Sequence, residues 1–560
     1  MCKINRIYFA NTKITLIMWF LFIKIIFNIK YDLDYVIKDN KLKAISCEFY
    51  TLAGLEEFKN LTDIDMSKNY IENLNNIRNL FNLVNINFQN NKIVDLEPIT
   101  NLTKLKVIIF DSNQIKNISA LSGLKNLDEI YFANNQIEDL SPIKSLTRLS
   151  KISFTNNRLK YVDALNGLKN LTFLDLSFNQ IEIINFGNLT RLTRLVLNNN
   201  KIKNVDCISN FVFLIELFLN DNQINEVNLT RITRIYDLRL SNNNISNIKS
   251  LSNLRVIQYL YLDNNQISNV EPIESFKSLF YLYLRNNKLK SINLKNMIYL
   301  ERLQLSFNQL NRIESLSSLL NLRELNLSYN NLNYFDPKQL NKMYRLAYLG
   351  LKNNNLTEIE FDNDLKFAFF VDLSFNNLNK IKLKDSRFLS NLYLNGNQID
   401  SLDYIENLPN LSEMDVSNCQ IKSIKSLSNV KIEILTVKNN PLVYFVDIDD
   451  LKYLSKVYIS DDQIDLFRNS KNNRIEKKNN NFEFIKSFDL ITTVTKLNNH
   501  PSICHLKIHF LSKNILFNLN GNDDINNFLR FCKEHFDGDI DLNQVIGSNH
   551  LDRLKHSKNI

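Results

Sequence analysis

The segment LTFLDLSFNQI, residues 171–181, has leucine at positions 171, 174 and 176, asparagine at 179 and isoleucine at 181. The same spacing recurs nineteen times along the chain, with conservative exchanges. Of the 18 intervals between successive asparagine positions, 12 are 22 residues long, five are 21 and one is 24. This regularity indicates one repeating structural unit rather than a series of unrelated domains. The asparagine positions are Asn69, Asn91, Asn113, Asn135, Asn157, Asn179, Asn200, Asn222, Asn243, Asn265, Asn287, Asn308, Asn330, Asn354, Asn376, Asn397, Cys419, Asn440 and Asp462.

Each unit predicts a short β-strand followed by a turn. Side chains alternate between the two faces of a strand, so Leu174 and Leu176 should point into a core while Asp175 faces out. One unit cannot bury its leucines alone, and neighbouring units are therefore expected to stack into a long parallel sheet over a shared core. The Asn179 amide offers both donors and an acceptor. We expect it to bind backbone groups where the chain leaves the strand, forming a ladder along the stack.

The second half of each unit is too short for a long helix and predicts 3-10 or single helical turns on a convex side. The 24-residue interval before Asn354 contains residues 335–340, FDPKQL, which predict a helical turn. Strands about 4.8 Å apart would give a concave sheet roughly 90 Å long. The expected fold class is an α/β repeat solenoid: a horseshoe with a parallel concave sheet, a convex side of short 3-10 or helical turns, and a small C-terminal module.

The repeat resembles the 22-residue class of leucine-rich-repeat proteins, which includes phosphatase-1 regulatory subunits and bacterial internalins. The unit junctions NLTKL at residues 101–105 and NLTRL at residues 188–192 are similar to the internalin-type junction. The resemblance covers residues 42–464. It implies a binding scaffold whose partner usually lies on the concave face, although a fold alone does not name a partner.

Strand alternation identifies the side chains on the concave face, which stand six, four and two residues before each asparagine position. The first units present acidic and amide side chains there, whereas the middle units present aromatic and basic ones. Tyrosine and arginine are enriched anchors of protein interfaces, so the middle units predict a partner-binding patch. Its expected residues are Phe218, Arg239, Tyr259, Tyr261, Tyr281, Tyr283, Arg285, Arg302 and Tyr348.

A second interpretation of these residues stays open. Tyrosine suits the surface of a strand, and rings on neighbouring strands stabilise a sheet by contacting each other. If instead the patch binds a partner, alanine substitutions at these solvent-facing positions should weaken binding and cost little stability.

The charge of the concave face differs in sign from that of the chain. The whole chain carries a net charge of +9, but the predicted concave positions hold 12 acidic and 8 basic residues, a net −4. A nucleic-acid groove would have the opposite sign, so nucleic acid is not an expected partner.

Residues 14–29, ITLIMWFLFIKIIFNI, differ from the repeats and follow the basic residues Lys3, Arg6 and Lys13. This order resembles a signal peptide or signal anchor. Lys24 interrupts the apolar run, which is short for a membrane span. The alternative is an apolar cap on the first repeat. A secretory route or membrane association through residues 14–29 is slightly favoured over a cytoplasmic location.

The chain is expected to comprise five parts. These are a hydrophobic segment (1–30), an N-terminal cap (31–60) containing the degenerate unit Leu42, Ile45 and Cys47, the repeats (61–465), a linker (466–482) and a small α/β module (483–560). Within the module, residues 503–511 and 515–519 alternate in polarity and predict a hairpin that turns at residues 512–514. Residues 522–536 predict a helix.

Catalytic, metal and cofactor sites are not expected. The chain has no glycine-rich phosphate loop, metalloprotease helix or nucleophile elbow. Its six cysteines do not cluster as a disulfide framework would, and Cys419 is expected to be a small buried residue of the ladder. Five residues of the module have zinc-binding side chains, but two of them, on one strand, would lie about 13 Å apart, too far to share an ion. They are Cys504, His505, His509, Cys532 and His535.

The function expected from these observations is a non-catalytic protein–protein interaction scaffold that binds a partner on the concave face. It needs no cofactor and no small-molecule substrate. The alternatives are a secreted or membrane-anchored internalin-like adhesin and a phosphatase-1 regulatory subunit.

Overall fold

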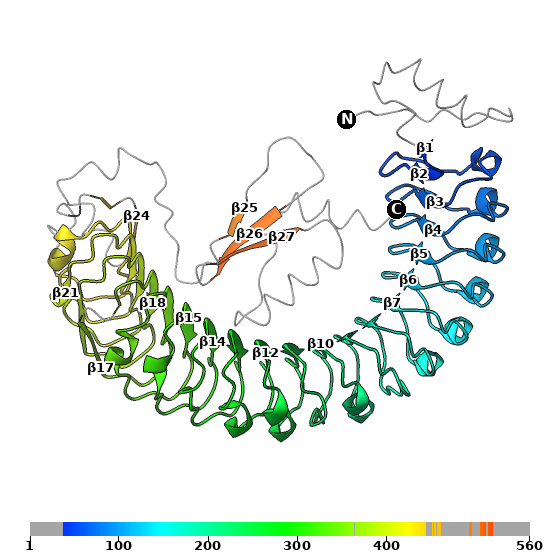
Figure 1. Cartoon of the computed structure of the whole chain (residues 1–560). Helices are drawn as coiled ribbons and strands as arrows, with labels where there is room; N and C mark the ends of the chain where they lie inside the picture. Colours follow the sequence, from blue (N-terminus) through cyan, green and yellow to red (C-terminus); the bar gives the residue numbers. More distant parts are fainter. Residues whose placement is uncertain are drawn as a thin grey trace, which may run out of the picture. The chain divides into compact units, whose positions relative to one another are not determined.

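The structure is a computed structural model that describes residues 37–362, 365–443, 451, 453–454, 456–460, 492–494, 505–510 and 513–518. The chain divides into two compact units, residues 1–457 and 458–560. The first unit holds the repeats, which follow a curve with the sheet on the concave side and short turns on the convex side (Figure 1). The horseshoe solenoid expected from the sequence is therefore confirmed.

One sheet contains nearly all of the strands in the first unit, and its strands run parallel in chain order. The short strand β1 (Ile37–Lys38) is the exception, because it pairs antiparallel with β2. Each repeat contributes one strand of three residues. These strands are β2 (Lys41–Lys43), β3 (Asp63–Asp65), β4 (Asn85–Asn87), β5 (Val107–Ile109), β6 (Glu129–Tyr131), β7 (Lys151–Ser153), β8 (Phe173–Asp175), β9 (Arg194–Val196), β10 (Glu216–Phe218), β11 (Asp237–Arg239), β12 (Tyr259–Tyr261), β13 (Tyr281–Tyr283), β14 (Arg302–Gln304), β15 (Glu324–Asn326), β16 (Tyr348–Gly350), β18 (Phe370–Asp372), β20 (Asn391–Tyr393), β22 (Glu413–Asp415), β23 (Ile434–Thr436) and β24 (Lys456–Tyr458).

The middle residue of these strands packs into the core, as alternation predicts. Leu174, Leu260 and Leu282 are fully buried, and the residues on either side of them are partly exposed on the concave face. Phenylalanine reinforces the core in four successive repeats, where Phe88, Phe110, Phe132 and Phe154 stack with ring centroids 5.5–5.7 Å apart. Each repeat thus buries its apolar side chains against the next one.

The asparagine ladder has the predicted role. Asn91 donates through Nδ2 to the carbonyl oxygen of Met66 in the preceding repeat at 2.9 Å and to that of Phe88 at 3.0 Å. Its Oδ1 accepts the backbone N–H of Ile71 at 2.9 Å. The same pattern recurs along the array, so each side chain ties its own turn to the repeat before it. These bonds satisfy buried backbone groups that the sheet leaves unpaired.

Cys419 takes the asparagine position in one repeat and is only 2% exposed. Its Sγ lies 3.4 Å from the carbonyl oxygen of Leu394, the place that an asparagine amide fills elsewhere. The prediction of a small buried group at this position is confirmed.

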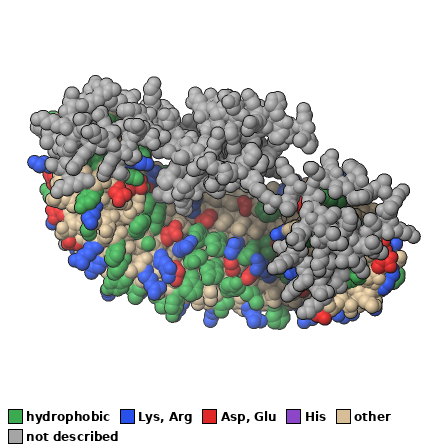
Figure 2. Space-filling view, turned by 90° about the horizontal axis from the view of Figure 1, so that it is seen from above, with side chains coloured by type: hydrophobic (Ala, Val, Ile, Leu, Met, Phe, Trp, Pro, Cys, Tyr) green, Lys and Arg blue, Asp and Glu red, His purple; other side chains and the backbone are tan. Residues whose placement is uncertain are grey.

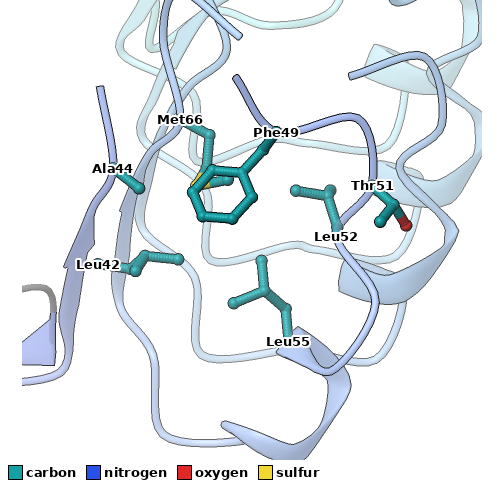
Figure 3. A pocket seen from close by; sticks show the side chains of 7 residues that line it. All are labelled: Leu42, Ala44, Phe49, Thr51, Leu52, Leu55 and Met66. Carbon is teal, nitrogen blue, oxygen red and sulfur yellow. The ribbon is translucent and has the colours of Figure 1, made fainter. Parts of the chain in front are cut away.

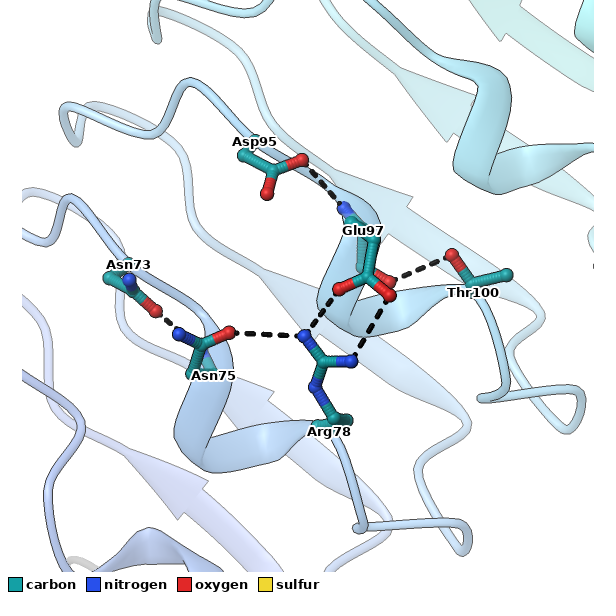
Figure 4. A network of polar contacts seen from close by, with 6 residues as sticks. All are labelled: Asn73, Asn75, Arg78, Asp95, Glu97 and Thr100. Atoms are coloured by element: carbon teal, nitrogen blue, oxygen red, sulfur yellow. Dashed lines mark hydrogen bonds and ion pairs between the residues drawn. The ribbon is translucent and has the colours of Figure 1, made fainter.

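On the convex side, most repeats form a 3-10 turn. In Figure 4, Asn73 and Asp95 each accept the backbone N–H two residues on, at 2.7 and 2.9 Å, which starts the turns η3 and η4. Arg78, which follows η3, forms an ion pair with Glu97 of η4 and so joins adjacent repeats. The turns are η2 (Leu55–Glu57), η3 (Asn75–Ile77), η4 (Glu97–Ile99), η5 (Ser119–Leu121), η6 (Ser141–Ile143), η7 (Asp163–Leu165), η8 (Asp206–Asn210), η9 (Lys249–Asn253), η10 (Glu271–Ile273), η11 (Leu316–Ser318), η12 (Pro337–Leu340) and η13 (Lys425–Asn429).

The helical turn predicted in the 24-residue interval is present as η12. Asp336 begins it, and its side chain accepts the backbone N–H of Lys338 at 3.1 Å. Pro337 occupies the first position, where a missing N–H costs nothing.

The prediction of turns alone on the convex side is wrong for the three repeats that follow η12. There the chain forms a second parallel sheet of β17 (Glu358–Asp362), β19 (Lys380–Lys384) and β21 (Ile405–Glu406). The sequences EIEFD and KIKLK alternate polar and apolar residues, which favours strands over turns. Their register places Glu358 opposite Lys380 and Glu360 opposite Lys382.

The N-terminal end of the array is closed by β2 and the segment that follows it. Leu42, Leu52 and Leu55 are buried there, and the ring of Phe49 lies among them beside a small apolar pocket (Figure 3). Of the degenerate unit, Leu42 is buried whereas Cys47 is exposed. Asn69 Oδ1 accepts the backbone N–H of Phe49, which continues the ladder, and that of Cys47, each at 3.0 Å.

The second unit contains an antiparallel sheet of β25 (Thr492–Val494), β26 (His505–Phe510) and β27 (Lys513–Asn518). The predicted hairpin is thus present, but it turns earlier, since Lys513 already pairs with Phe510. The apolar segment 14–29, the linker 466–482 and the helix 522–536 lie outside the described residues.

Candidate functional site

The middle of the concave sheet brings two pairs of tyrosines together. Because β12 and β13 are one repeat apart and pair in parallel, Tyr259 lies opposite Tyr281 and Tyr261 opposite Tyr283. Tyr261 and Tyr283 stack with centroids 4.9 Å apart at 25°, whereas Tyr259 meets Tyr281 edge-on at 5.1 Å. We call these four residues the tyrosine cluster. All four side chains are partly exposed rather than fully solvent-facing, because each ring covers its neighbour.

Arg239 joins the tyrosine cluster to Phe218. Its guanidinium lies 4.4 Å from the ring centroid of Phe218 and 5.0 Å from that of Tyr261, within the range of cation–π contacts. Two hydrogen bonds of 3.0 and 2.9 Å to Asp237 fix it there and raise the pKa of Arg239. Phe218 is only 7% exposed, so the expectation that it faces solvent is wrong. It supports Arg239 from beneath.

Arg302 and Arg285 are the exposed cations beside the tyrosine cluster. The guanidinium of Arg302 lies 5.0 Å from the centroid of Tyr281, and its hydrogen bond to Tyr283 raises the pKa of the guanidinium. Arg285 lies instead over Phe307, at 5.0 Å from its centroid.

Tyr348 belongs to a separate stack. Its ring packs on Phe370 at 5.0 Å, and Phe370 in turn contacts Tyr393 at 5.2 Å. A Cβ atom built on Gly350 would approach the hydroxyl of Tyr348 to 3.0 Å, so this tyrosine folds across Gly350. Burial raises the pKa of Tyr348. Tyr348 is therefore predicted by the sequence as part of the patch, but its ring contacts lie in this separate stack and not in the tyrosine cluster.

Most carboxylates on this part of the face are bound within the sheet. Glu216 accepts the hydroxyl of Tyr236 at 2.8 Å and pairs with Arg194 at 2.7 Å. Glu324 accepts from Gln304 and lies 3.8 Å from Arg302. These carboxylate oxygens are therefore already engaged within the sheet, although the net charge of the face stays as counted.

Burial changes the ionisation of several groups at the site. It raises the pKa of Tyr261 and of Tyr283, so both phenols stay protonated at neutral pH. It also raises the pKa of Asp263 to about 6, against the lowering effect of the backbone N–H of Arg285. Asp263 therefore exchanges its proton about one unit below neutral pH.

Several aromatic residues escaped the sequence analysis because they stand outside the three positions that it considered. Tyr236 and Phe280 flank Tyr259, at 6.1 and 6.3 Å between centroids. Phe307, Tyr329 and Phe375 stand directly before an asparagine position. Seen from above the concave side, hydrophobic side chains gather in the visible middle of the array with basic and acidic ones between them (Figure 2).

Within the part of the chain that the structure describes, no cluster of His, Cys, Asp or Glu side chains could hold a metal ion. In the same residues, no helix has both the length and the apolar character that crossing a bilayer requires.

Comparisons with known proteins agree with this architecture. A family model for leucine-rich repeats (two copies) matches residues 105–145 and 125–167. No curated protein sequence matches the chain. Among solved structures, a leucine-rich-repeat protein of Leptospira interrogans is 25% identical with a TM-score of 0.56, over 65% of this chain and 91% of the other.

Two further solved structures share the fold at lower identity. A plant peptide hormone receptor in complex with the peptide RGF2 is 23% identical, with a TM-score of 0.62 over 76% of this chain and 77% of the receptor. The functional domain of the internalin InlJ of Listeria monocytogenes is 20% identical, with a TM-score of 0.55 over 66% of this chain and 78% of that domain. This chain has the fold of a leucine-rich-repeat protein, and its residues 105–167 match the family model of that repeat. Such proteins generally act in protein–protein interaction, and they are typically non-enzymatic.

Proposed function

We propose that this protein is a non-catalytic scaffold that binds a protein partner on its concave face, over β10 to β14. The observation that carries the proposal is the tyrosine cluster: four adjoining, partly exposed rings on two paired strands, with exposed arginines beside them. Arg302 covers Tyr281, and Arg285 follows Tyr283 on the chain. The fold itself needs only the buried leucines between these tyrosines.

The chemistry of the cluster suits a protein interface. Tyrosine and arginine supply large contact areas together with hydrogen-bonding groups, and they dominate the binding energy of many interfaces. The rings of Tyr261 and Tyr283 hold each other in place, so little side-chain freedom would be lost on binding. The mutual stacking also supports the sheet, and part of the effect of any substitution here should fall on stability.

One of the similar structures supports a protein or peptide partner. It is a receptor in complex with a peptide, and its fold matches three quarters of this chain. The internalin-like adhesin and the phosphatase-1 regulatory subunit stay predictions, since each rests on resemblance alone.

The proposal can be tested by photo-crosslinking in the full chain. A benzoylphenylalanine placed at Tyr283 should cross-link a partner in cells, and the partner can be identified by mass spectrometry. Tyr161 is the matched control, because it is exposed and lies outside the sheet. A cross-link from both positions would indicate non-specific contact and contradict the proposal.

Binding of the purified partner then measures the contribution of each ring. Tyr261→Ala and Tyr283→Ala should each weaken binding by about 1–3 kcal/mol. Circular dichroism and thermal unfolding must show that each variant is folded. If folded variants of all four tyrosines and Arg285 bind as the wild type does, the site is wrongly assigned.

A further inference from the structure

The residue before each asparagine of the ladder adopts a left-handed backbone conformation. Its φ lies between +50° and +58° at nearly every repeat and is +72° at Gly396. Asparagine fills most of these positions, as expected, because its short amide side chain tolerates this conformation. The asparagines are Asn90, Asn134, Asn156, Asn199, Asn242, Asn264, Asn286, Asn353, Asn418 and Asn439.

Aromatic residues break this rule at Phe178, Phe307, Tyr329 and Phe375, with φ between +54° and +57°. A bulky side chain is strained in this region of backbone space. The fold does not require the rings, because asparagine serves the same turn in the neighbouring repeats. Strain of this kind, kept where a better residue exists, indicates a function for the side chain.

Three of these rings belong to a run of five consecutive repeats that also carries two cations. In chain order the five side chains are Arg285, Phe307, Tyr329, Lys352 and Phe375, which we call the rim strip. Phe307 and Tyr329 stack face to face, 4.1 Å between centroids and 9° between planes. Arg285 lies 5.0 Å over Phe307, and Lys352 lies 5.0 Å over Phe375.

Phe375 is also held from the other side. A Cβ atom on Gly396 would come within 2.8 Å of its ring, so the ring packs directly on the glycine backbone. Phe307 is nevertheless 38% exposed and Phe375 is 44% exposed. The rim strip therefore presents fixed, solvent-accessible rings.

The two cations of the rim strip are available to a partner. Among the described residues, neither Arg285 nor Lys352 forms an ion pair with a carboxylate, and each rests on an aromatic face instead. The carboxylates of adjacent strands are bound internally, as Glu324 is by Gln304 and Asp372 is by Ser374. The rim strip itself carries two cations and no carboxylate, and complementary charge selects partners at interfaces.

We propose that the rim strip binds an acidic, extended polypeptide segment of the partner. This rests on the proposed function and extends its site through Arg285, which adjoins the tyrosine cluster. Five repeats span about 19 Å, the length of about six extended residues. The two cations stand three repeats apart, so the segment should carry two acidic residues about four positions apart with apolar residues between them.

The test uses a phage-displayed library of random 12-residue peptides, selected against the full chain. Enriched peptides should carry acidic residues at that spacing. Their affinity, measured by fluorescence anisotropy, should fall at least tenfold for the double variant Phe307→Asn, Phe375→Asn and for Arg285→Ala, Lys352→Ala. The asparagine variant should have a Tm equal to or above that of the wild type, because it relieves the strained positions.

Phe178→Asn is the matched control. It makes the same change at the same backbone geometry in an earlier repeat, so it should leave peptide affinity unchanged. A lower Tm in the rim variant would mean that the rings are structural, and enriched peptides without acidic residues would refute the charge argument. Tighter rim-dependent binding of a 12-residue oligothymidylate would assign the strip to nucleic acid and overturn the proposal.

The two proposals fail separately. If the selected peptides depend on Tyr261 and Tyr283 but bind the rim variants normally, the rim strip is refuted and the concave site stands. If they depend on the rim strip but not on these tyrosines, the rim strip stands, and the concave site is decided by the affinity of the purified partner for the tyrosine variants.

Discussion

Asp263 Oδ1 accepts a hydrogen bond of 2.7 Å from the backbone N–H of Arg285, which holds the same position in the next repeat. Asn198 makes the equivalent bond to Asn220 at 2.8 Å, and Asn220 makes it to Ser241 at 2.8 Å. An amide and a carboxylate therefore serve the same role in this sheet. Only the carboxylate brings a charge that has to be partly desolvated, and this burial raises the pKa of Asp263 to about 6.

Replacing Asp263 with Asn should stabilise the protein above pH 6. The pKa of Asp263 in the folded chain is above the ordinary value of 3.8, so the folded state holds its proton more tightly than the unfolded state does. Stability from this group is present at low pH and is lost as the pH rises through about 6. Asp263→Asn should remove that loss, worth about 1–3 kcal/mol, while keeping the acceptor. Urea unfolding of the wild type and of Asp263→Asn at pH 4.5 and pH 8 measures the difference in the free energy of unfolding.

The reverse change, Asn198→Asp, is the control for this prediction. It places a carboxylate at the equivalent partly buried position and should make stability more dependent on pH. If wild type and Asp263→Asn lose the same stability between the two pH values, the role assigned to Asp263 is wrong.

Restoring asparagine at position 419 should strengthen the ladder. The Cys419 thiol makes only weak contacts, 3.4 Å to the carbonyl oxygen of Leu394 and 3.6 Å to that of Ser417. Asn397, one repeat earlier, donates at 3.0 Å to the equivalent carbonyl oxygen of Leu373 and at 2.7 Å to that of Leu394 in its own turn. Cys419→Asn should therefore raise the free energy of unfolding by about 1 kcal/mol. The converse Asn397→Cys should lower it, and equal Tm values for all three proteins would contradict the account.

Sequence periodicity predicted the sheet, the ladder and the register of the tyrosines, because all three follow from the repeat. Periodicity did not predict how far a side chain on the concave face is exposed, because its neighbours decide that. Phe218 stands at an outward position but is buried by the arginines that lie over it. Tyr348 folds down because Gly350 leaves space beside it. No spacing rule contains that information.

Two other features can be recognised in the sequence itself. The alternation of EIEFD and KIKLK predicts strands on the convex side, but the repeat pattern suggested turns there. Aromatic residues at Phe307, Tyr329 and Phe375 interrupt a column of asparagines. An aromatic residue at these positions is unusual only because the backbone there is left-handed. The sequence does not show that backbone geometry, whereas the structure does.

The convex strands β17 and β19 should depend on their opposite charges for pairing. Glu360 lies opposite Lys382 and forms an ion pair with it, and the register places Glu358 opposite Lys380. Lys382→Glu should destabilise the protein by roughly 0.5 kcal/mol, because like charges then face each other. Adding Glu360→Lys should restore stability, and 1 M NaCl should shrink both effects. A double variant no more stable than Lys382→Glu would contradict the pairing.

Replacing Gly350 with Ala should release Tyr348 from the concave surface. The added Cβ would lie 2.8 Å from Asn326 Oδ1 and 3.0 Å from Tyr348 Oη, and both side chains would have to move. Strain should lower stability by about 1–2 kcal/mol. Exposure should also bring the pKa of Tyr348 down toward its ordinary value, since burial is what raises it.

Ultraviolet difference titration of the phenols measures the change at Tyr348. Gly350→Ala should gain one tyrosine that ionises near pH 10, and the gain should vanish in the double variant Gly350→Ala, Tyr348→Phe. If Gly350→Ala titrates as the wild type does, Tyr348 is not held down by the space beside Gly350. Such a result would return Tyr348 to the set of exposed residues that a partner on the concave face can contact.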